Sequence, residues 1–307
     1  MSLIARRVRT TARRSPQQVD RGATSRMSGS SPWTESKRSL FERSRLQSRN
    51  DAGANRQYLF DCWGAVSARI HAVKMIRLFL DFDGTLTTIC PMPGDVRLSD
   101  AARRSLRRLS RHPRVRVTIV SGRRISLLRK LVRLPGIRLL GLYGFESDEK
   151  IALPLAVPRE LPRLRAVLRP LPAELPGIRL EDKGISVAIH FRGALADTQL
   201  RAKDRIREIV RKFQPGFHII KTHSAWEIAP RQVEDKGAAL RKELKGLRKS
   251  SLTIFVGDDL TDEPAFAVLP RGITVHVGRT SRTKARFWLR DPEEVAMFLG
   301  RIVEELT

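Results

Sequence analysis

From Met75 onward, short apolar runs alternate with amphipathic segments. The runs IRLFLDF (76–82), VRVTIV (115–120) and GIRLLGLYG (136–144) are typical of buried strands. Residues 125–134 lie between two of these runs and carry leucines and valine at helical spacing. This alternation of strand and helix predicts an α/β fold with a doubly wound parallel sheet.

The same pattern returns in the last sixty residues. The apolar runs at 251–256 and 272–277 predict two more strands, which flank a short helix at 262–269. Asp291 and Pro292 suit the cap and first turn of a final helix. The apolar stripe of that helix consists of Val295, Phe298, Leu299, Ile302 and Val303.

Residues 148–229 break the alternation. They begin with a proline-punctuated helical stretch, followed by a run that alternates polar and apolar residues around Lys183-Gly184, as in a hairpin. A helix at 196–213 and a further strand region at 217–230 follow. This pattern predicts an inserted α+β domain with an antiparallel sheet.

Residues 1–74 differ from the rest because they are rich in Arg and Ser and show no sustained period. We expect a disordered basic extension. The segment also loosely resembles an organelle transit peptide. In a third interpretation the natural protein begins at Met75. A non-structural extension is favoured over a targeting signal, and the main domain then consists of 75–147 and 230–307.

The net charge of +27 raises the question of a nucleic-acid partner. The lysines and arginines are scattered along the chain, aromatic residues make up 6%, and no nucleic-acid motif is present, so this partner is not favoured. No apolar run is long enough to cross a membrane. Two cysteines are too few for a disulfide framework, which favours a cytoplasmic location. The sequence carries no signal for an oligomeric state.

Polar residues stand where several of these strands end. Asp81 and Asp83 end the first strand, Ser121-Gly122-Arg123 follows the second, and Gly257-Asp258-Asp259 follows a late one. Open parallel sheets bind ligands beyond the carboxyl ends of their strands. Several carboxylates at one edge would repel one another without a cation, and oxygen ligands favour Mg²⁺. Lys236, which opens a helix, adds a positive charge.

These residues suit the hydrolysis of a phosphate monoester. Asp81 would be the nucleophile and Asp83 the proton-transfer group, once Mg²⁺, Lys236 and loop amides have neutralised the phosphate dianion. Each motif alone could be a turn or a solvated charge, but their common order at strand ends favours chemistry. The predicted phosphate contacts are Gly84, Ser121, Gly122 and Lys236, and the predicted metal ligands are Asp81, Asp83 and Asp258. Asp259 and Asp262 are expected either to be ligands at one remove or to orient the metal waters and Lys236.

The stretches DFDGTLT, VSGR, the lysine before GAAL, and GDDLTDE resemble the four motifs of haloacid dehalogenase superfamily phosphatases. The resemblance implies a phospho-aspartyl intermediate on Asp81. It also implies that Asp83 protonates the leaving oxygen and then activates water. The inserted domain would be a cap that closes over the active site.

Four longer stretches, GDDLTDEPAF, GLYGFES, LEDKGISVAIHFR and WEIAPRQVEDKGAAL, are similar to trehalose-6-phosphate phosphatases over about residues 75–305. This implies a Mg²⁺-dependent release of trehalose and phosphate from a small sugar phosphate. The chain departs from the family pattern at Phe82, Thr88 and Tyr143, where tyrosine, proline and histidine are usual. The resemblance implies sugar contacts from Glu181, Lys183, Arg192 and Glu227 of the cap.

Two other functions stay open. A related cap could select sucrose phosphate or a glycosyl-phosphoglycerate instead. Alternatively, the chain could be a basic binding protein on an inactive scaffold, although a binding role does not need Asp81, Asp83, Lys236 and Asp258 together.

Three further residues of the inserted domain invite a functional interpretation, His190 and His223 as catalytic groups and Trp226 as a ring that stacks on a sugar. His190 is expected to be structural or to lie on the cap face, His223 to be exposed, and Trp226 to belong to the cap core rather than to stack on a sugar.

Overall fold

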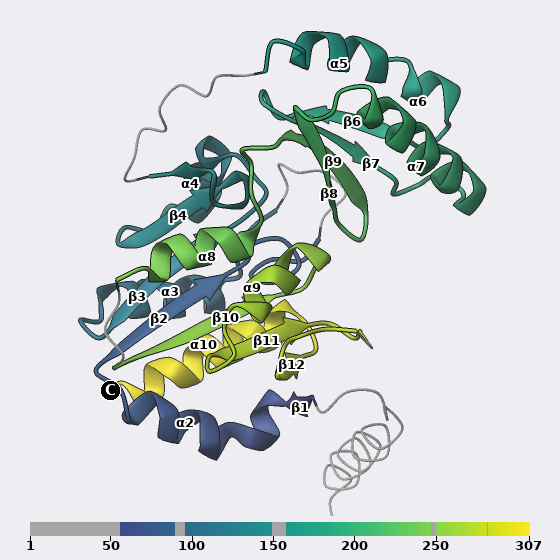
Figure 1. The fold of residues 1–307 in the computed structure, drawn as a ribbon. Coiled ribbons are helices and arrows are strands. Elements are labelled where there is room, and N and C mark those ends of the chain that lie inside the picture. The colour runs from purple at the N-terminus through teal and green to yellow at the C-terminus, as the bar shows by residue number, and fades with distance from the viewer. Residues whose placement is uncertain (1–55, 90–95, 149–157, 247–249, 281) are drawn as a thin grey trace, which may run out of the picture. The chain divides into compact units, whose positions relative to one another are not determined.

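The computed structural model describes residues 56–307 except 90–95, 149–157, 247–249 and 281. Its main sheet has eight strands in the order β1-β12-β11-β10-β2-β3-β4-β5 (Figure 1). All neighbours are parallel except β5, which runs antiparallel to β4. The strands are β1 (Gln57–Tyr58), β2 (Met75–Leu80), β3 (Val115–Val120), β4 (Ile137–Gly141), β5 (Glu146–Ser147), β10 (Ser251–Gly257), β11 (Ile273–Val277) and β12 (Phe287–Leu289).

Helices cover both faces of this sheet, as the doubly wound prediction requires (Figure 1). One face packs against α2 (Trp63–His71), α3 (Asp100–Arg111), α4 (Ile125–Val132) and α10 (Pro292–Glu305). The other face packs against α8 (Lys236–Leu244) and α9 (Glu263–Ala267). Strand β2 serves both layers, because Leu78 and Leu80 point to the first and Phe79 to the second.

The helix ends follow the signals in the sequence. Ser99 caps α3 by accepting a hydrogen bond from the Ala102 amide at 3.2 Å. Asp291 caps α10 in the same way, with the Glu294 amide at 2.9 Å, and Pro292 occupies the first turn. All five residues of the predicted α10 stripe are buried. The main domain also contains three short 3-10 helices, η1 (Leu59–Cys62), η2 (Leu142–Gly144) and η3 (Leu260–Asp262).

A second sheet lies between β5 and α8 in the sequence and forms the inserted α+β cap. Its four antiparallel strands have the order β6-β7-β9-β8, and the predicted hairpin turns at Gly184. Its helices share one apolar cluster with the sheet. Trp226 belongs to this cluster, as predicted. The elements are α5 (Leu161–Leu168), α6 (Leu171–Glu174), β6 (Arg179–Asp182), β7 (Val187–His190), α7 (Ala196–Arg211), β8 (Phe217–Lys221) and β9 (Ala225–Pro230).

The segment just before Met75 differs from the prediction of a disordered extension up to residue 74. β1 pairs with β12 at the edge of the main sheet, and η1 and α2 bury Leu59, Val66 and Ile70. The apolar residues are few, but they recur at helical spacing, so a small helix can use them to cover the core. A chain that began at Met75 would lack this layer. The rest of the predicted extension, 1–55, lies outside the described residues.

Three smaller elements were also not expected. Strands β5 and β12 are too short to give a period, and the run at 136–144 forms a strand only as far as Gly141 before it turns into η2.

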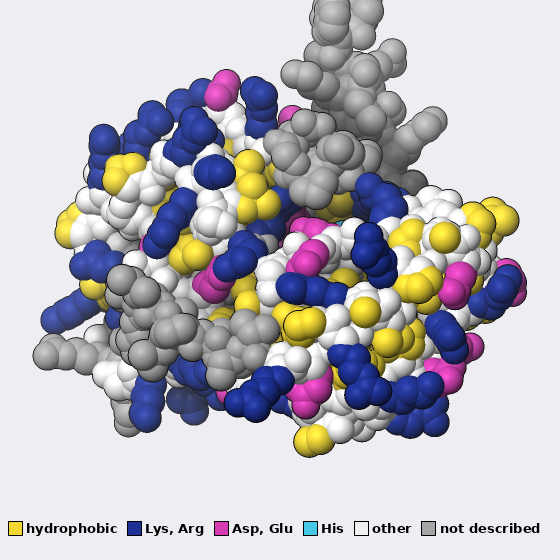
Figure 2. Space-filling view, turned by 90° about the horizontal axis from the view of Figure 1, so that it is seen from above, with side chains coloured by type: hydrophobic (Ala, Val, Ile, Leu, Met, Phe, Trp, Pro, Cys, Tyr) yellow, Lys and Arg dark blue, Asp and Glu magenta, His cyan; other side chains and the backbone are white. Residues whose placement is uncertain are grey.

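On the face in view in Figure 2, Lys and Arg side chains are spread widely rather than gathered in one patch. Within the described part of the chain, no helix is long and apolar enough to cross a membrane.

Candidate active site

The carboxyl ends of β2, β3 and β10 meet at one edge of the main sheet, because β2 pairs with both of the others. A cavity of about 440 Å³ opens there, within the size range of small-molecule sites. Its walls come from the main domain and from the cap. The predicted site residues that line it are Asp81, Asp83, Ser121, Gly122, Lys236, Asp258 and Asp259 from the main domain and Glu181, Lys183, Arg192 and Glu227 from the cap.

Lys236 lies buried at the floor of this cavity between two carboxylates. Its Nζ donates to Asp81 Oδ1 at 2.5 Å and to Asp262 Oδ1 at 2.7 Å. Burial alone would lower the pKa of Lys236, but the charges of Asp262 and Asp81 outweigh it and raise the pKa. The side chain is therefore a fixed cation next to the predicted nucleophile.

Asp81, Asp258 and Asp262 each offer a carboxylate oxygen, and these oxygens lie within 4.8 Å of one another. Burial is the main reason that the pKa of Asp81 rises to about 7, with Lys236 opposing the shift. Burial and the charge of Asp81 likewise raise the pKa of Asp258 well above its usual value. Asp81 and Asp258, whose pKa values are raised, fit a hard divalent cation, because its charge would favour their ionised forms.

The place of Asp262 in this cluster follows from its hydrogen bonds. Its Oδ2 accepts from the amides of Asp258 and Asp259 at 3.1 and 2.9 Å, while Oδ1 holds Lys236. Of the two roles predicted for Asp262, this geometry supports the orientation of Lys236. Asp259 instead caps η3 and lies beside His223 of the cap, whose Nδ1 is 2.6 Å from Asp259 Oδ1. The His223 side chain is exposed, as predicted, although the ion pair was not.

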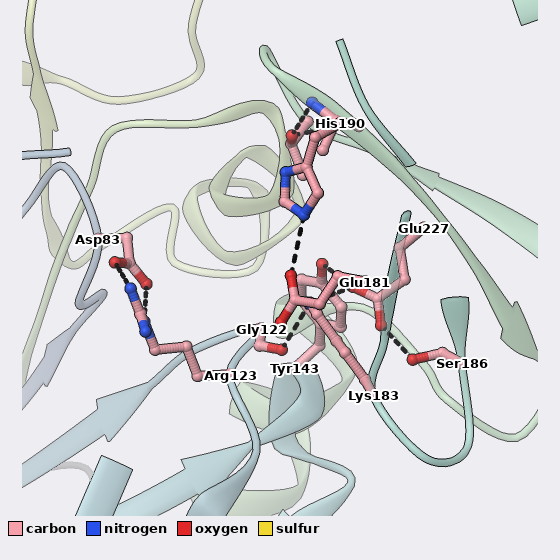
Figure 3. Close-up of polar contacts among 11 residues, drawn as sticks. Asp83, Gly122, Arg123, Tyr143, Glu181, Lys183, Ser186, His190 and Glu227 are labelled. Carbon is pink, nitrogen blue, oxygen red and sulfur yellow. Dashed lines mark hydrogen bonds and ion pairs between the residues drawn. The ribbon is translucent and has the colours of Figure 1, made fainter. Parts of the chain in front are cut away.

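Asp83 is arranged differently from the prediction that its carboxylate is a metal ligand. Both of its oxygens accept hydrogen bonds from Arg123, one from Nε and one from Nη2, each at 2.7 Å (Figure 3). It does not belong to the cluster of Asp81, Asp258 and Asp262. The Asp83 side chain is about one third exposed and faces the cavity, where a proton-transfer group has access to a ligand.

The predicted phosphate contacts divide into two kinds. Ser121 and Gly122 line the cavity, and the Ser121 hydroxyl accepts from the Arg123 amide at 3.1 Å. Gly84 does not line it, and its amide already donates to the Thr87 carbonyl at 2.8 Å. Its φ of +82° and the closeness of the Asp258 carboxylate explain the glycine, since a Cβ there would lie 2.0 Å from Asp258 Oδ2. The glycine makes room for Asp258.

The polar face of the cap sheet forms the opposite wall. Glu181, Ala188 and Glu227 are opposite one another on three adjacent strands, so their side chains share a face. His190 Nε2 lies 2.9 Å from Glu181 Oε2 (Figure 3). This hydrogen bond is the main reason that the pKa of Glu181 is lowered, so the carboxylate stays ionised. His190 therefore lies on the cap face, which is one of the two positions expected for it.

Two residues that sequence reasoning gave no role are central to this site. Arg123 was noted at a strand end, but its pairing with Asp83 depends on how the loops after β2 and β3 meet. Tyr143 was noted for its departure from the family pattern. The structure places its hydroxyl 2.9 Å from Glu227 Oε2. The signal for both lay inside the motifs VSGR and GLYGFES.

The fold is similar to that of hydrolases of the haloacid dehalogenase type. A haloacid dehalogenase-like hydrolase from Bacteroides thetaiotaomicron superposes with a TM-score of 0.54 at 18% identity, over 75% of this chain and 100% of that one. The C-terminal domain of a C. albicans trehalose-6-phosphate phosphatase gives a TM-score of 0.72 at 21% identity, over 82% of this chain and 99% of that one. These two likenesses establish the fold.

The sequence comparisons identify the family. The trehalose-phosphatase family model matches residues 79–293. A trehalose-phosphate phosphatase of Mycobacterium marinum is 33% identical over 251 residues, which are 75% of this chain and 62% of the relative. Trehalose 6-phosphate phosphatase RA3 of Zea mays is 30% identical over 258 residues, which are 76% of this chain and 71% of the relative. The chain belongs to the trehalose-phosphatase family, as the sequence resemblance implied.

Proposed function

We propose that this protein is a Mg²⁺-dependent phosphatase that hydrolyses trehalose 6-phosphate to trehalose and phosphate. The observation that carries the proposal is the position of Lys236 between Asp81 and Asp262, on the floor of a cavity whose other wall is the polar face of the cap. The main domain supplies groups for phosphate chemistry, and the cap supplies groups that can bind hydroxyls. A small sugar phosphate and a cytoplasmic location are part of this proposal.

In the first step, a carboxylate oxygen of Asp81 attacks phosphorus and the bond from phosphorus to the sugar oxygen breaks. Lys236 fixes the Asp81 carboxylate at 2.5 Å and offsets the charge of the phosphate. Ser121 offers its hydroxyl to the phosphate oxygens. The leaving oxygen takes a proton from Asp83, and the sugar departs as a neutral alcohol.

In the second step, Asp83 takes a proton from water as the water oxygen attacks phosphorus. The bond between phosphorus and Asp81 breaks, which releases phosphate and restores the Asp81 carboxylate. Both carboxylate oxygens of Asp83 accept hydrogen bonds from Arg123. This contact therefore has to open at one oxygen before Asp83 can pass a proton to the leaving oxygen.

Asp81 and Asp258 would hold the Mg²⁺ ion, with Asp262 next to them at the same edge. When bound, the ion supplies positive charge that screens the phosphate from the Asp81 carboxylate. The raised pKa values of Asp81 and Asp258 support this assignment, because a cation would relieve the cost of ionising two buried neighbours.

The cap contacts would select the sugar. Glu181 is held ionised by His190, and Arg192 and Lys183 line the same wall. Charged groups on a cavity wall discriminate strongly for ligands whose hydroxyls satisfy them, because an unmatched ligand leaves them unpaired. The assignment of trehalose among the possible sugars also draws on the family to which the chain belongs.

A substrate panel tests the proposal. Phosphate release is measured from trehalose 6-phosphate, sucrose 6-phosphate, a glucosyl-phosphoglycerate and glucose 6-phosphate, each with Mg²⁺ and with a chelator. We expect the highest kcat/KM for trehalose 6-phosphate and loss of activity with the chelator. Release from trehalose 6-phosphate that is no faster than from glucose 6-phosphate would refute the sugar assignment. Absence of turnover with every phosphate ester would favour a binding protein.

A further inference from the structure

Tyr143 joins the phosphate-binding loop to the cap. Its amide donates to the Ser121 carbonyl at 2.9 Å, which fixes its backbone to the loop after β3. Its ring covers Gly122, where a Cβ would lie 2.8 Å from both Cζ and the hydroxyl oxygen. Its hydroxyl then reaches across to Glu227 on β9 at 2.9 Å (Figure 3). One side chain thus contacts both walls of the cavity.

The Glu227 carboxylate that receives this hydroxyl is buried and has donors on both oxygens. Oε2 accepts from Tyr143 and from Lys183 Nζ at 2.7 Å, and Oε1 accepts from the Ser186 hydroxyl at 2.5 Å. Lys183 Nζ also donates to the Gly122 carbonyl at 3.2 Å. The orientation of Lys183 and Glu227 relative to the phosphate loop therefore depends on a single connected set of hydrogen bonds.

The backbone of Tyr143 indicates that this position is held by its surroundings. Its φ is +62°, in the left-handed region that bulky residues rarely adopt, and the preceding Leu142 has a φ of +46°. Such backbone conformations persist where neighbouring contacts determine them, and they cluster at functional sites. Here the Ser121 carbonyl, Gly122 and Glu227 are those contacts.

We propose that Tyr143 is a positioning residue that sets the sugar-binding face of the cap in register with the phosphate loop, by orienting Glu227 and through it Lys183. This rests on the proposed function, because it concerns how the same site distinguishes its sugar phosphate from other monoesters. Tyr143 acts only on ligands large enough to contact the cap. An aryl phosphate such as p-nitrophenyl phosphate meets the main-domain groups without the sugar contacts.

The test compares two tyrosine-to-phenylalanine variants, because the chain has two tyrosines and both donate to a glutamate. Tyr143→Phe removes the hydroxyl and keeps the ring on Gly122. Tyr58→Phe removes a hydroxyl that donates to Glu294 at 2.6 Å, in β1 and away from the cavity lining. The readout is kcat/KM for the best sugar phosphate of the panel divided by kcat/KM for p-nitrophenyl phosphate.

We expect Tyr143→Phe to lower this ratio about tenfold, as for the loss of one hydrogen bond to a charged group, and Tyr58→Phe to leave it unchanged. In a Glu227→Gln background the Tyr143→Phe change should lower the ratio less than twofold, because the carboxylate that Tyr143 orients has already been replaced. A similar loss in both backgrounds, or an equal loss with both substrates, would overturn the proposal.

Hydrogen exchange of the ligand-free protein gives a readout that needs no substrate. Amides around 183–187 and 225–228 should exchange faster in Tyr143→Phe than in Tyr58→Phe, and unchanged exchange contradicts the coupling. Glu227→Gln, which weakens the contact from the other side, provides the same exchange test if Tyr143→Phe does not fold. The proposed function has a separate test in the substrate panel. It is refuted if the unmodified protein does not prefer trehalose 6-phosphate.

Discussion

The floor of the cavity and the part of the cap wall formed by Glu181 and His190 are built in opposite ways. On the floor, Lys236 and Asp262 have side chains that are 2% and 0% exposed, and each charge is held by neighbours fixed to the main sheet. On the cap wall, the Glu181 and His190 side chains are 37% and 28% exposed and pair with each other. Buried charge is costly unless it is fully compensated, so the floor tolerates little change.

The comparison separates chemistry from recognition. On the floor, Asp81 and Asp258 directly follow the parallel strands β2 and β10, each of which is hydrogen-bonded to a neighbour on both sides, and Lys236 opens helix α8. The wall residues come from the polar face of an antiparallel sheet whose other face packs on helices. A substitution on that polar face leaves the apolar cluster intact. We therefore expect changes on the floor to affect every substrate and changes on the wall to affect the sugar.

The largest expected effect comes from Asp81→Asn. An amide cannot form the phospho-aspartyl intermediate, so turnover of trehalose 6-phosphate and p-nitrophenyl phosphate should both fall at least about a thousandfold. Circular dichroism should show a folded protein, and Asp204→Asn on the exposed side of α7 serves as the control. Retained activity in Asp81→Asn would refute the nucleophile assignment.

On the wall, Glu181→Gln should raise KM for trehalose 6-phosphate about tenfold through the loss of a charged hydrogen-bond acceptor. The rate with p-nitrophenyl phosphate should change less than twofold. Glu174→Gln, an exposed change elsewhere in the cap, is the matched control. Equal losses with both substrates would contradict the division between floor and wall.

The smallest effect concerns stability and pH. In the metal-free protein the pKa of Asp81 is raised to about 7, so its protonated form is favoured on folding and its contribution to stability falls as pH rises from about 4 through 7. Mg²⁺ binds the ionised form and offsets this loss. The increase in Tm on adding Mg²⁺ should therefore be several degrees larger at pH 8 than at pH 6. An increase that is equal at both values would contradict the assignment of the metal site.

Much of this architecture could be predicted because its signals are local. The long strands and α10 have clear periods, and Asp291 caps its helix as predicted. The segment 57–71 was missed because its few apolar residues are diluted by an arginine-rich flank. Contacts with β12 and with the last helix, both far away in the sequence, hold that segment, and such contacts are not visible in a local pattern.

The site shows the same limit. The residues after β2, β3 and β10 could be assigned to one cavity because parallel strands deliver their carboxyl ends to one edge. The partner of Asp83 could not be assigned from the sequence, because a carboxylate that binds a metal and a carboxylate that pairs with Arg123 look alike there. Gly84 was assigned to the ligand, while its backbone conformation actually makes space for Asp258, a residue 174 positions further on.

The pairing of β1 with β12 has a consequence for synthesis of the protein. Gln57–Tyr58 lie early in the chain, but the strand beside them is Phe287–Leu289, and the Trp63 indole donates to Glu305 at 2.9 Å. The ribosome makes these partners last. The early segment must therefore wait, with Leu59 and Ile70 uncovered, until almost the whole polypeptide has emerged, and a stalled or prematurely terminated chain would present that apolar surface to chaperones and proteases.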